Sequence, residues 1–255
     1  MTDIFRTELE QGLNGLHLVL SDEKKEQLYQ YYLMVMEKNK VMNLTAITEE
    51  REFVQKHIID SLAIVKAGEG VCSILEGGDI DVIDVGTGAG LPGIVLKIAW
   101  PKLRIVLFDS LQKRLRFLDE VINKLGLEQI KTLHGRAEDI GQMKQYRETF
   151  DLVTSRAVAN LATLSEYCLP LVKPYGLFLP FKSADIDEEL KEARQPIKLL
   201  GGELCAEEKY QLPGTDIARS LLIIEKIKHT PHEYPRKAGI PAKDPLGSRH
   251  SSNQV

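Results

Sequence analysis

A glycine-rich loop that directly follows a buried strand constrains the fold of this chain most. Segment 81–94 reads DVIDVGTGAGLPGI, so an apolar run leads straight into Gly86, Gly88 and Gly90. Glycine permits backbone conformations that other residues avoid, and it lets the main chain approach a ligand closely. Pro92 follows where the first turn of a helix can accept it, because its missing N–H costs nothing there. The loop therefore predicts a strand, a tight turn and a helix, with a ligand crevice at the carboxyl end of the strand.

From about residue 79, short β-branched runs alternate with helical patterns, which is typical of a parallel sheet with helical connections. The expected strands are residues 79–85, 103–109, 130–134, 150–155, 175–181, 203–210 and 219–227. The expected helices between them are residues 91–99, 112–125, 161–171 and 185–200. The predicted fold class is α/β, with a Rossmann-like, doubly wound and mostly parallel seven-stranded sheet.

The first third of the chain has a helical pattern instead. Ser21 can cap a helix whose first turn carries acidic residues, and apolar residues around Tyr31 recur on it at helical spacing. A second helix is expected over residues 49–65. His57 and Asp60 fall one turn apart on it and share a face. We expect this pair to tie the N-terminal helices to the sheet.

These patterns divide the chain of 255 residues into three parts. They are an N-terminal helical extension (1–67), a ligand-binding domain (68–230) and a basic tail (231–255). A chain of this length buries one substantial core, so one main domain is expected rather than two equal ones. The charge of the tail fits a solvated segment as well as a local nucleic-acid-binding patch.

Composition excludes several classes of protein. The net charge of −4 argues against a chain whose whole surface binds nucleic acid. No apolar stretch approaches about 18 residues, and the first residues lack the pattern of a signal peptide, so we expect no membrane association and a cytoplasmic location. Cys72, Cys168 and Cys205 lie far apart and outside any metal-ligand spacing. We expect three buried thiols in a reducing compartment and no metal site.

Two nucleoside cofactors compete for the glycine loop. The spacing of Gly88, Gly90 and Gly93 satisfies GxGxxG, a weak fingerprint of dinucleotide binding. However, the strand ends just before Gly86, and the pattern becomes DxGxGxG, which resembles motif I of the class I methyltransferases. Asp109, at the end of the next strand, can accept the ribose hydroxyls of either cofactor. Too few residues lie outside the sheet for the substrate domain of a dehydrogenase, which favours S-adenosylmethionine over a nicotinamide dinucleotide.

The end of the fourth strand bears on the methyl acceptor. Residues 151–159 read DLVTSRAVA and lack the Asn/Asp-Pro-Pro-Tyr/Phe motif of enzymes that methylate exocyclic amino groups. No cysteine is expected where it could act as the nucleophile for cytosine C5 chemistry. A ring nitrogen with a free lone pair, such as guanine N7, needs no general base, and we expect no catalytic base. Arg156 would reach the crevice and position the substrate, or form an ion pair with a neighbouring acid.

Six segments, taken in order, resemble one family over nearly the whole chain. They are residues 39–45 (NKVMNLT), 57–61 (HIIDS), 84–93 (DVGTGAGLPG), 109–114 (DSLQKR), 136–139 (RAED) and 155–157 (SRA). Together they are similar to the small-subunit ribosomal RNA methyltransferase G family, also called glucose-inhibited division protein B. Residues 234–246 (YPRKAGIPAKDPL) resemble the longer C-terminus of members from Gram-positive bacteria.

The resemblance implies an S-adenosylmethionine-dependent class I methyltransferase that modifies N7 of one guanosine in the 530 loop of bacterial 16S rRNA. The substrate is expected to be the 30S subunit or an assembly intermediate, and the enzyme a monomer. The cofactor contacts implied by the family are Gly86, Leu91, Ala137, Glu138 and Arg156. The strand-end argument adds Gly88, Gly90 and Asp109.

RNA contacts are expected from basic residues near the crevice and in the tail, which mainly bind phosphate. These are Arg114, Arg116, Lys182, Arg219, Arg236 and Lys237. Many members of the family have Lys-Gly after the fifth strand, where this chain has Lys182-Ser183. Tyr31, Tyr32 and Phe181 could stack on a splayed-out base, but we expect core packing for each. The alternatives are an NAD-dependent oxidoreductase and a non-catalytic RNA-binding factor of ribosome assembly.

Overall fold

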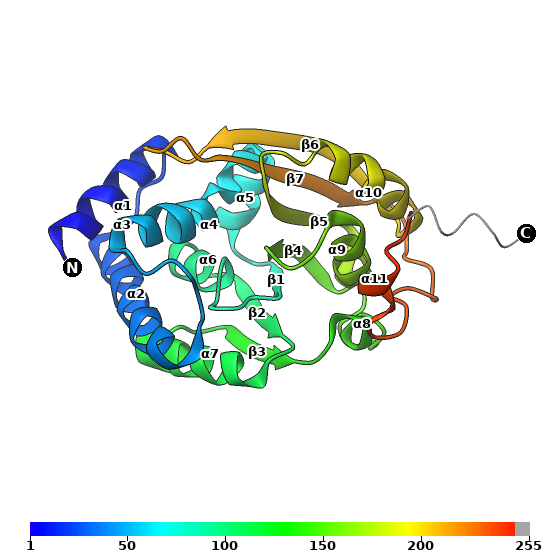
Figure 1. The fold of residues 1–255 in the computed structure, drawn as a ribbon, viewed down its shortest axis with the longest axis horizontal. Coiled ribbons are helices and arrows are strands. Elements are labelled where there is room, and N and C mark those ends of the chain that lie inside the picture. The colour runs from blue at the N-terminus through cyan, green and yellow to red at the C-terminus, as the bar shows by residue number, and fades with distance from the viewer. Residues whose placement is uncertain (248–255) are drawn as a thin grey trace, which may run out of the picture.

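The computed structural model describes residues 1–247, and positions 248–255 of the predicted tail lie outside the described residues. Its seven-stranded sheet has the order β3-β2-β1-β4-β5-β7-β6 (Figure 1). The strands are β1 Asp81–Val85, β2 Arg104–Asp109, β3 Ile130–His134, β4 Phe150–Arg156, β5 Val172–Ser183, β6 Gly202–Gln211 and β7 Ala218–Lys226. Strands β1 to β5 pair in parallel, and β7 runs antiparallel to β5 and β6. The predicted fold class is confirmed.

The strand order reverses between β1 and β4, since the chain runs outward from β1 to β3 and then returns to the other side of β1. This switch point leaves room at the carboxyl ends of β1 and β4, where open α/β sheets bind their ligands.

The helices account for most of the remaining chain. They are α1 Asp3–Gly15, α2 Asp22–Met42, α3 Glu50–Phe53, α4 Asp60–Leu62, α5 Glu69–Gly77, α6 Gly93–Ala99, α7 Gln112–Leu125, α8 Ala137–Ile140, α9 Leu161–Cys168, α10 Asp187–Leu199 and α11 Ile240–Lys243. A π-helical segment (Val54–Ile59) and two 3₁₀ segments (Ala63–Ala67 and Leu169–Leu171) continue α3, α4 and α9.

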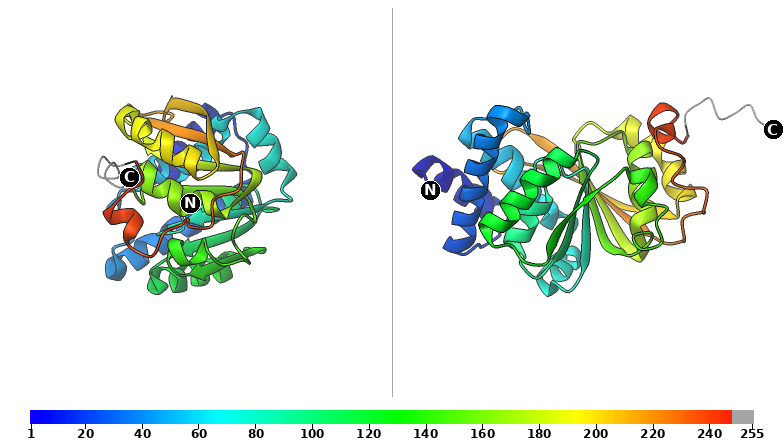
Figure 2. Two further views of the ribbon diagram at one scale, coloured as in Figure 1. Left: turned by 90° about the vertical axis from the view of Figure 1, so that its right-hand side faces the viewer. Right: turned by 90° about the horizontal axis from the view of Figure 1, so that it is seen from below.

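The helices form a layer on each face of the sheet, as the right-hand view in Figure 2 shows. Alternate residues of a strand point to opposite faces, so Val82 packs with α1 to α7 while Ile83 packs with α9 and α10. Phe5, Tyr31 and Phe53 of the N-terminal extension are fully buried in the first of these cores. The extension therefore shares a hydrophobic core with the sheet, and the division at residue 67 stays a prediction.

The predicted start of α2 is confirmed, because the Ser21 hydroxyl accepts the Lys24 N–H at 3.4 Å. The second predicted helix differs from the expectation of one regular α-helix over 49–65. Its centre is the π-helical segment Val54–Ile59, which contains His57 and ends just before Asp60. A π turn widens the helix locally, and such turns are frequent at functional sites.

Three expectations are corrected. Helices α1, α5, α8 and α11 were not expected from the sequence. Pro92 stands at the N-cap of α6, one residue before its first turn. Of the three cysteines only Cys168 is buried; Cys72 is half-buried, and Cys205, on the edge strand β6, is exposed. Within residues 1–247, no helix combines the length and apolar character needed to cross a membrane.

Candidate cofactor and substrate site

The glycine loop turns sharply at the end of β1. The N–H groups of Gly86 and Thr87 both donate to the carbonyl oxygen of Phe108 in β2, at 2.8 and 3.0 Å. Gly86, Gly88 and Gly90 have φ values of 72°, 60° and 102°, in the left-handed region that favours glycine. The backbone of the loop is therefore held against β2 in a conformation that other residues rarely adopt.

The three glycines are required for different reasons. A Cβ at Gly86 would lie 2.4 Å from Val158 Cγ2, and one at Gly90 would lie 2.6 Å from Ile94 Cγ1. A Cβ at Gly88 would meet nothing closer than 3.9 Å. Packing thus requires glycine at the first and third positions, whereas Gly88 leaves open space beside the loop that a ligand can fill.

Asp84, inside motif I, holds this loop in place through hydrogen bonds to its carboxylate. Its Oδ2 accepts the Thr87 hydroxyl at 2.6 Å and the Gly93 N–H at 2.9 Å, while Oδ1 is buried and has no partner. Burial raises the pKa of this carboxyl to about 6. Sequence reasoning gave Asp84 no role of its own, although it is the acid of the DxGxGxG pattern.

Asp109 lies at the carboxyl end of β2, as expected, and is almost completely buried. Its carboxylate accepts the N–H groups of Gly88 (3.0 Å) and Leu111 (2.8 Å), and Arg114 Nη1 lies 3.4 Å away. A carboxylate has about four acceptor positions, so these contacts leave capacity for a hydroxyl group of a ligand.

Two cavities meet at the glycine loop. The first, of about 630 Å³, lies between the loop, the π-helical segment and the ends of β5 and β7. The second, of about 360 Å³, lies between the loop, the end of β2, α8 and the C-terminal segment. Gly86, Arg114 and Ala157 line both cavities. Ala157 has a φ of 56°, which a non-glycine residue rarely adopts and which is frequent at functional sites.

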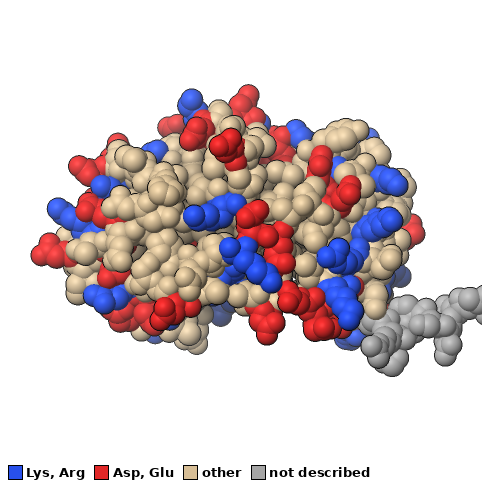
Figure 3. All heavy atoms as spheres, turned by 90° about the horizontal axis from the view of Figure 1, so that it is seen from above, with Lys and Arg blue, Asp and Glu red and all other residues tan. Residues whose placement is uncertain are grey.

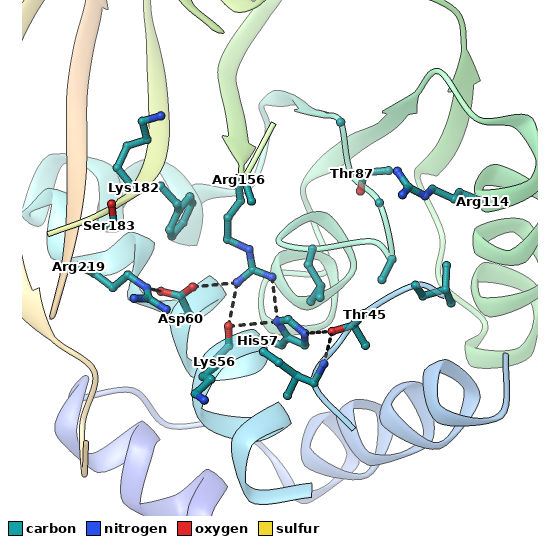
Figure 4. Close-up of a pocket in the computed structure, with 18 residues that line it drawn as sticks. Thr45, Lys56, His57, Asp60, Thr87, Arg114, Arg156, Lys182, Ser183 and Arg219 are labelled. Atoms are coloured by element: carbon teal, nitrogen blue, oxygen red, sulfur yellow. Dashed lines mark hydrogen bonds and ion pairs between the residues drawn. The ribbon is translucent and has the colours of Figure 1, made fainter. Parts of the chain in front are cut away.

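A charged cluster forms one wall of the first cavity (Figure 4). Arg156 Nη1 donates to Asp60 Oδ2 at 3.0 Å, and Arg219 Nε donates to Asp60 Oδ1 at 3.3 Å. Arg156 Nη2 also lies 3.4 Å from His57 Nδ1, whose ring contacts the Thr45 hydroxyl through Nε2 at 2.8 Å. Burial, together with the nearby Arg156, lowers the pKa of His57 to about 3, so the imidazole is neutral at neutral pH.

Comparison with known proteins gives the family. A family model described as GidB, rRNA small subunit methyltransferase G, matches residues 24–213. The ribosomal RNA small subunit methyltransferase G of Lachnoclostridium phytofermentans is 49% identical over 236 residues, which are 92% of this chain and 95% of that protein. The protein of the same name from Desulforamulus reducens is 49% identical over 246 residues, with 96% of this chain and 100% of that protein covered.

This chain belongs to the rRNA small subunit methyltransferase G family. Membership confirms the predicted family, the methyltransferase activity on small-subunit rRNA and S-adenosylmethionine as the methyl donor, and it sets aside the dinucleotide-dependent alternative. A solved structure from Galdieria sulphuraria, assigned as a sarcosine dimethylglycine methyltransferase, shares the fold alone. It superposes with a TM-score of 0.51 at 12% identity, and covers 66% of this chain and 85% of that chain.

In this member of the family, the residues predicted to contact the cofactor converge on the two cavities. Gly86, Gly88, Leu91 and Arg156 line the first, and Asp109, Ala137 and Glu138 line the second beside Gly86. Gly90 does not line either cavity, and instead supports the loop by packing against Ile94 and Leu118. The structure thus brings seven of the eight predicted residues together around one crevice. Their cofactor contacts stay predictions.

The predicted RNA-binding residues are in more varied surroundings. Arg116 and Lys237 are exposed, whereas Lys182 contacts the Ala159 carbonyl oxygen and Glu189. Arg219 is held by Asp60, and Arg236 by Glu166. Figure 3 shows lysines and arginines interspersed with acids over the face formed by β6 and α10. The RNA contacts of the six residues stay predictions.

The aromatic residues considered for base stacking divide into two groups. Tyr31 is fully buried and its hydroxyl donates to the Ala89 carbonyl oxygen at 2.9 Å, so it supports the glycine loop. Tyr32 packs in the same core. Phe181 is also buried in that core, but it lines the first cavity as well.

Several residues around the crevice were not predicted. Thr45, in the NKVMNLT segment, contacts His57 and lines the first cavity. Tyr167, Gly239 and Ala242 line the second cavity. Thr45 could have been found as part of the family segment, but Gly239 and Ala242 carry no local signal for a ligand site. No group of three His, Cys, Asp or Glu residues in the described part of the chain is arranged to hold a metal ion.

Proposed function

We propose that this enzyme methylates N7 of a single guanosine in the 530 loop of bacterial 16S rRNA. The observation that carries the choice of a ring nitrogen is the state of the acid–base groups in the first cavity. Asp60 is occupied by two arginines, and the pKa of His57 is about 3. Neither group suits proton abstraction near neutral pH. A nucleophile that already has a free lone pair requires no such group.

The crevice fits an S-adenosyl nucleoside. The open space beside Gly88 allows the ligand to lie against the loop backbone, and the Asp109 carboxylate faces the second cavity, where ribose hydroxyls would bind. The adenine would lie between Ala137, Glu138 and the C-terminal segment. When bound there, the cofactor supplies an electrophilic methyl group on a sulfonium, which an incoming lone pair can displace in line.

The protein contributes positioning and exclusion of water rather than proton transfer. The junction of the cavities at Gly86 and Ala157 directs the reacting end of the crevice toward Arg156. Its guanidinium is oriented by Asp60, His57 and the Lys56 carbonyl oxygen. A donor fixed in this way can orient the acceptor oxygens of a base or phosphate, and such alignment supplies much of the rate of a displacement reaction.

The enzyme acts, in this proposal, as a monomer on the 30S subunit or an assembly intermediate in the bacterial cytoplasm. Exposed cations such as Arg116 would contact phosphate, and the target base would be splayed out into the first cavity. Phe181 is the aromatic residue at that cavity and could pack against the base. The proposed RNA contacts rest on the placement of these residues, and the choice of substrate rests on the family.

Labelled methyl transfer tests the proposal. The purified protein is incubated with tritium-labelled S-adenosylmethionine and either 30S subunits or naked 16S rRNA from a strain that lacks the enzyme, and the product is mapped by mass spectrometry. The expected product is one N7-methylguanosine in the 530 loop. Transfer to another atom or nucleotide would contradict the proposal. Binding of rRNA without any transfer would instead support a non-catalytic assembly factor.

A further inference from the structure

The segment after β7 is not a loose tail but is anchored along its length. Arg147 donates hydrogen bonds to three of its backbone carbonyl groups, those of Thr230 (2.8 Å), Pro231 (3.1 Å) and Tyr234 (2.7 Å). Gln142 donates to two more, those of His232 (3.1 Å) and Pro235 (2.9 Å). Both anchoring side chains follow α8, on the side of the sheet opposite the N-terminal helices (Figure 1).

The strongest anchor is an ion pair between Arg236 and Glu166. The Glu166 side chain, on α9, has 0% of its surface exposed. Its two oxygens accept Arg236 Nε at 2.9 Å and Nη2 at 2.7 Å, and the Arg236 backbone N–H donates to the same carboxylate at 2.8 Å. A buried carboxylate needs such a partner, so the arginine is directed inward rather than toward an external phosphate.

The anchored segment then passes over the second cavity. The Gly239 N–H donates to Glu138 Oε1 at 2.8 Å, and the Thr163 hydroxyl donates to the Pro241 carbonyl oxygen at 2.9 Å. Gly239 and Ala242 line the cavity across from the end of β2, where Asp109 lies. Helix α11 is drawn beside α9 and above α8 in Figure 1.

We propose that residues 230–246 form the outer wall of the adenosine subsite. The inference rests on the proposed cofactor site and extends it to a segment that no sequence motif marks as a ligand element. Without this segment the second cavity would lack its Gly239 and Ala242 side and be open to water, and Glu138 would lose its Gly239 partner. The ligand it encloses is the neutral nucleoside end of the cofactor, because the charged methionine end would extend toward Arg156 in the first cavity.

Two variants test this wall in different ways. Ala242→Trp leaves every anchoring contact in place and places bulk at the cavity, so it obstructs the ligand without weakening the attachment of the segment. Arg236→Gln removes the anchor and loosens the wall. Lys243→Gln is the matched control, because Lys243 is an exposed cation of the same helix that does not line the cavity. Calorimetry with S-adenosylhomocysteine and, separately, with adenosine measures the affinity of each protein.

The expected result is a loss of at least about tenfold in affinity for both ligands in Ala242→Trp and Arg236→Gln, and wild-type affinity in Lys243→Gln. The melting temperature of each ligand-free protein is measured alongside. If Arg236→Gln fails to fold, Ala242→Trp decides the question. Wild-type affinity for the two ligands in Ala242→Trp would overturn the inference. So would an Arg236→Gln protein that binds both ligands with wild-type affinity but binds rRNA with a smaller salt dependence. A wild-type protein that binds neither ligand would refute the proposed cofactor site itself.

Discussion

Arg156, the last residue of β4, and Asp60, the first residue of α4, form a buried ion pair with Nη1 and Oδ2 3.0 Å apart. The side chains are 12% and 4% exposed. Arg219 of β7 donates to the other oxygen of the same carboxylate. Through these two arginines, Asp60 joins the N-terminal helices to two strands of the sheet at the wall of the first cavity.

Asp60→Asn is expected to destabilise the fold and to reduce rRNA methylation. The amide cannot neutralise two arginines, and breaking a buried ion pair from one side costs about 3 to 5 kcal/mol. Loss of the charge also frees Arg156 from its orientation, so kcat/KM should fall about tenfold or more. Urea denaturation and steady-state kinetics measure the two effects. Asp81→Asn is the control, because the side chains of Arg104 and Asp81 are 41% and 47% exposed, and an ion pair this accessible to water should matter much less. Equal destabilisation by both changes would contradict the structural role given to Asp60.

Gly88→Ala is expected to impair cofactor binding in a way that backbone strain cannot explain. Gly88 and Gly126 have nearly the same φ, 60° and 62°, and a Cβ has free space at both in the ligand-free protein. Alanine therefore imposes the same strain of about 1 to 2 kcal/mol at each position. Only Gly88 lines the crevice, so only Gly88→Ala should weaken S-adenosylhomocysteine binding, by about tenfold. Gly126→Ala is the matched comparison: it should lower the melting temperature as much as Gly88→Ala does and leave the calorimetric affinity unchanged. Similar affinities in the two variants would refute the site.

The buried His57 predicts a specific loss of stability in mild acid. In the folded protein the pKa of His57 is about 3, against an ordinary value of 6.5 in the unfolded chain. The unfolded state therefore binds the extra proton between these values, and the stability contributed by His57 is present above pH 6.5 and is lost as the pH falls toward 3. The slope is about 1.4 kcal/mol per pH unit.

His57→Gln removes this titration. We expect the stability of the wild type, relative to this variant, to fall by about 1.5 kcal/mol between pH 6.5 and pH 5, as measured by urea denaturation at each pH. Asp84 works in the opposite direction, because its raised pKa favours the folded state as the pH falls below about 6. It is present in both proteins, and its effect cancels in the difference. Parallel stability curves for the two proteins would show that His57 does not titrate as inferred.

The sheet and the glycine loop could be predicted because their signals are local. A strand is recognised from its apolar run and a turn from its glycines, so the strands differ from the expected ranges by only a few residues at their ends. Helix α1 could have been predicted as well, since Phe5, Leu9 and Leu13 recur every four residues and Thr2 caps it.

The charged contacts of the site could not be predicted in the same way. The ion pair of Asp60 with Arg219 joins residues 159 positions apart, and that of Glu166 with Arg236 joins residues 70 positions apart. Charge and hydropathy place an arginine in solvent unless its partner is known, and the partner is set by the tertiary fold. For this reason Arg236 was expected on the RNA surface, although its side chain is directed into the protein.

Arg116 is therefore the better test of the RNA surface. It is exposed on α7, and this helix follows the end of β2 that lies at the crevice. Within the described residues, the Arg116 side chain makes no hydrogen bond or ion pair. If it binds a phosphate, Arg116→Gln should weaken rRNA binding and reduce the slope of log K against log salt by about 0.7 to 0.9. Filter binding across a salt series measures this slope. Lys102→Gln provides the control, because Lys102 is an exposed cation just before β2, at the amino ends of the strands, whereas the crevice lies at their carboxyl ends. A slope that changes equally in both variants would mean that the RNA responds to net charge rather than to a contact at Arg116.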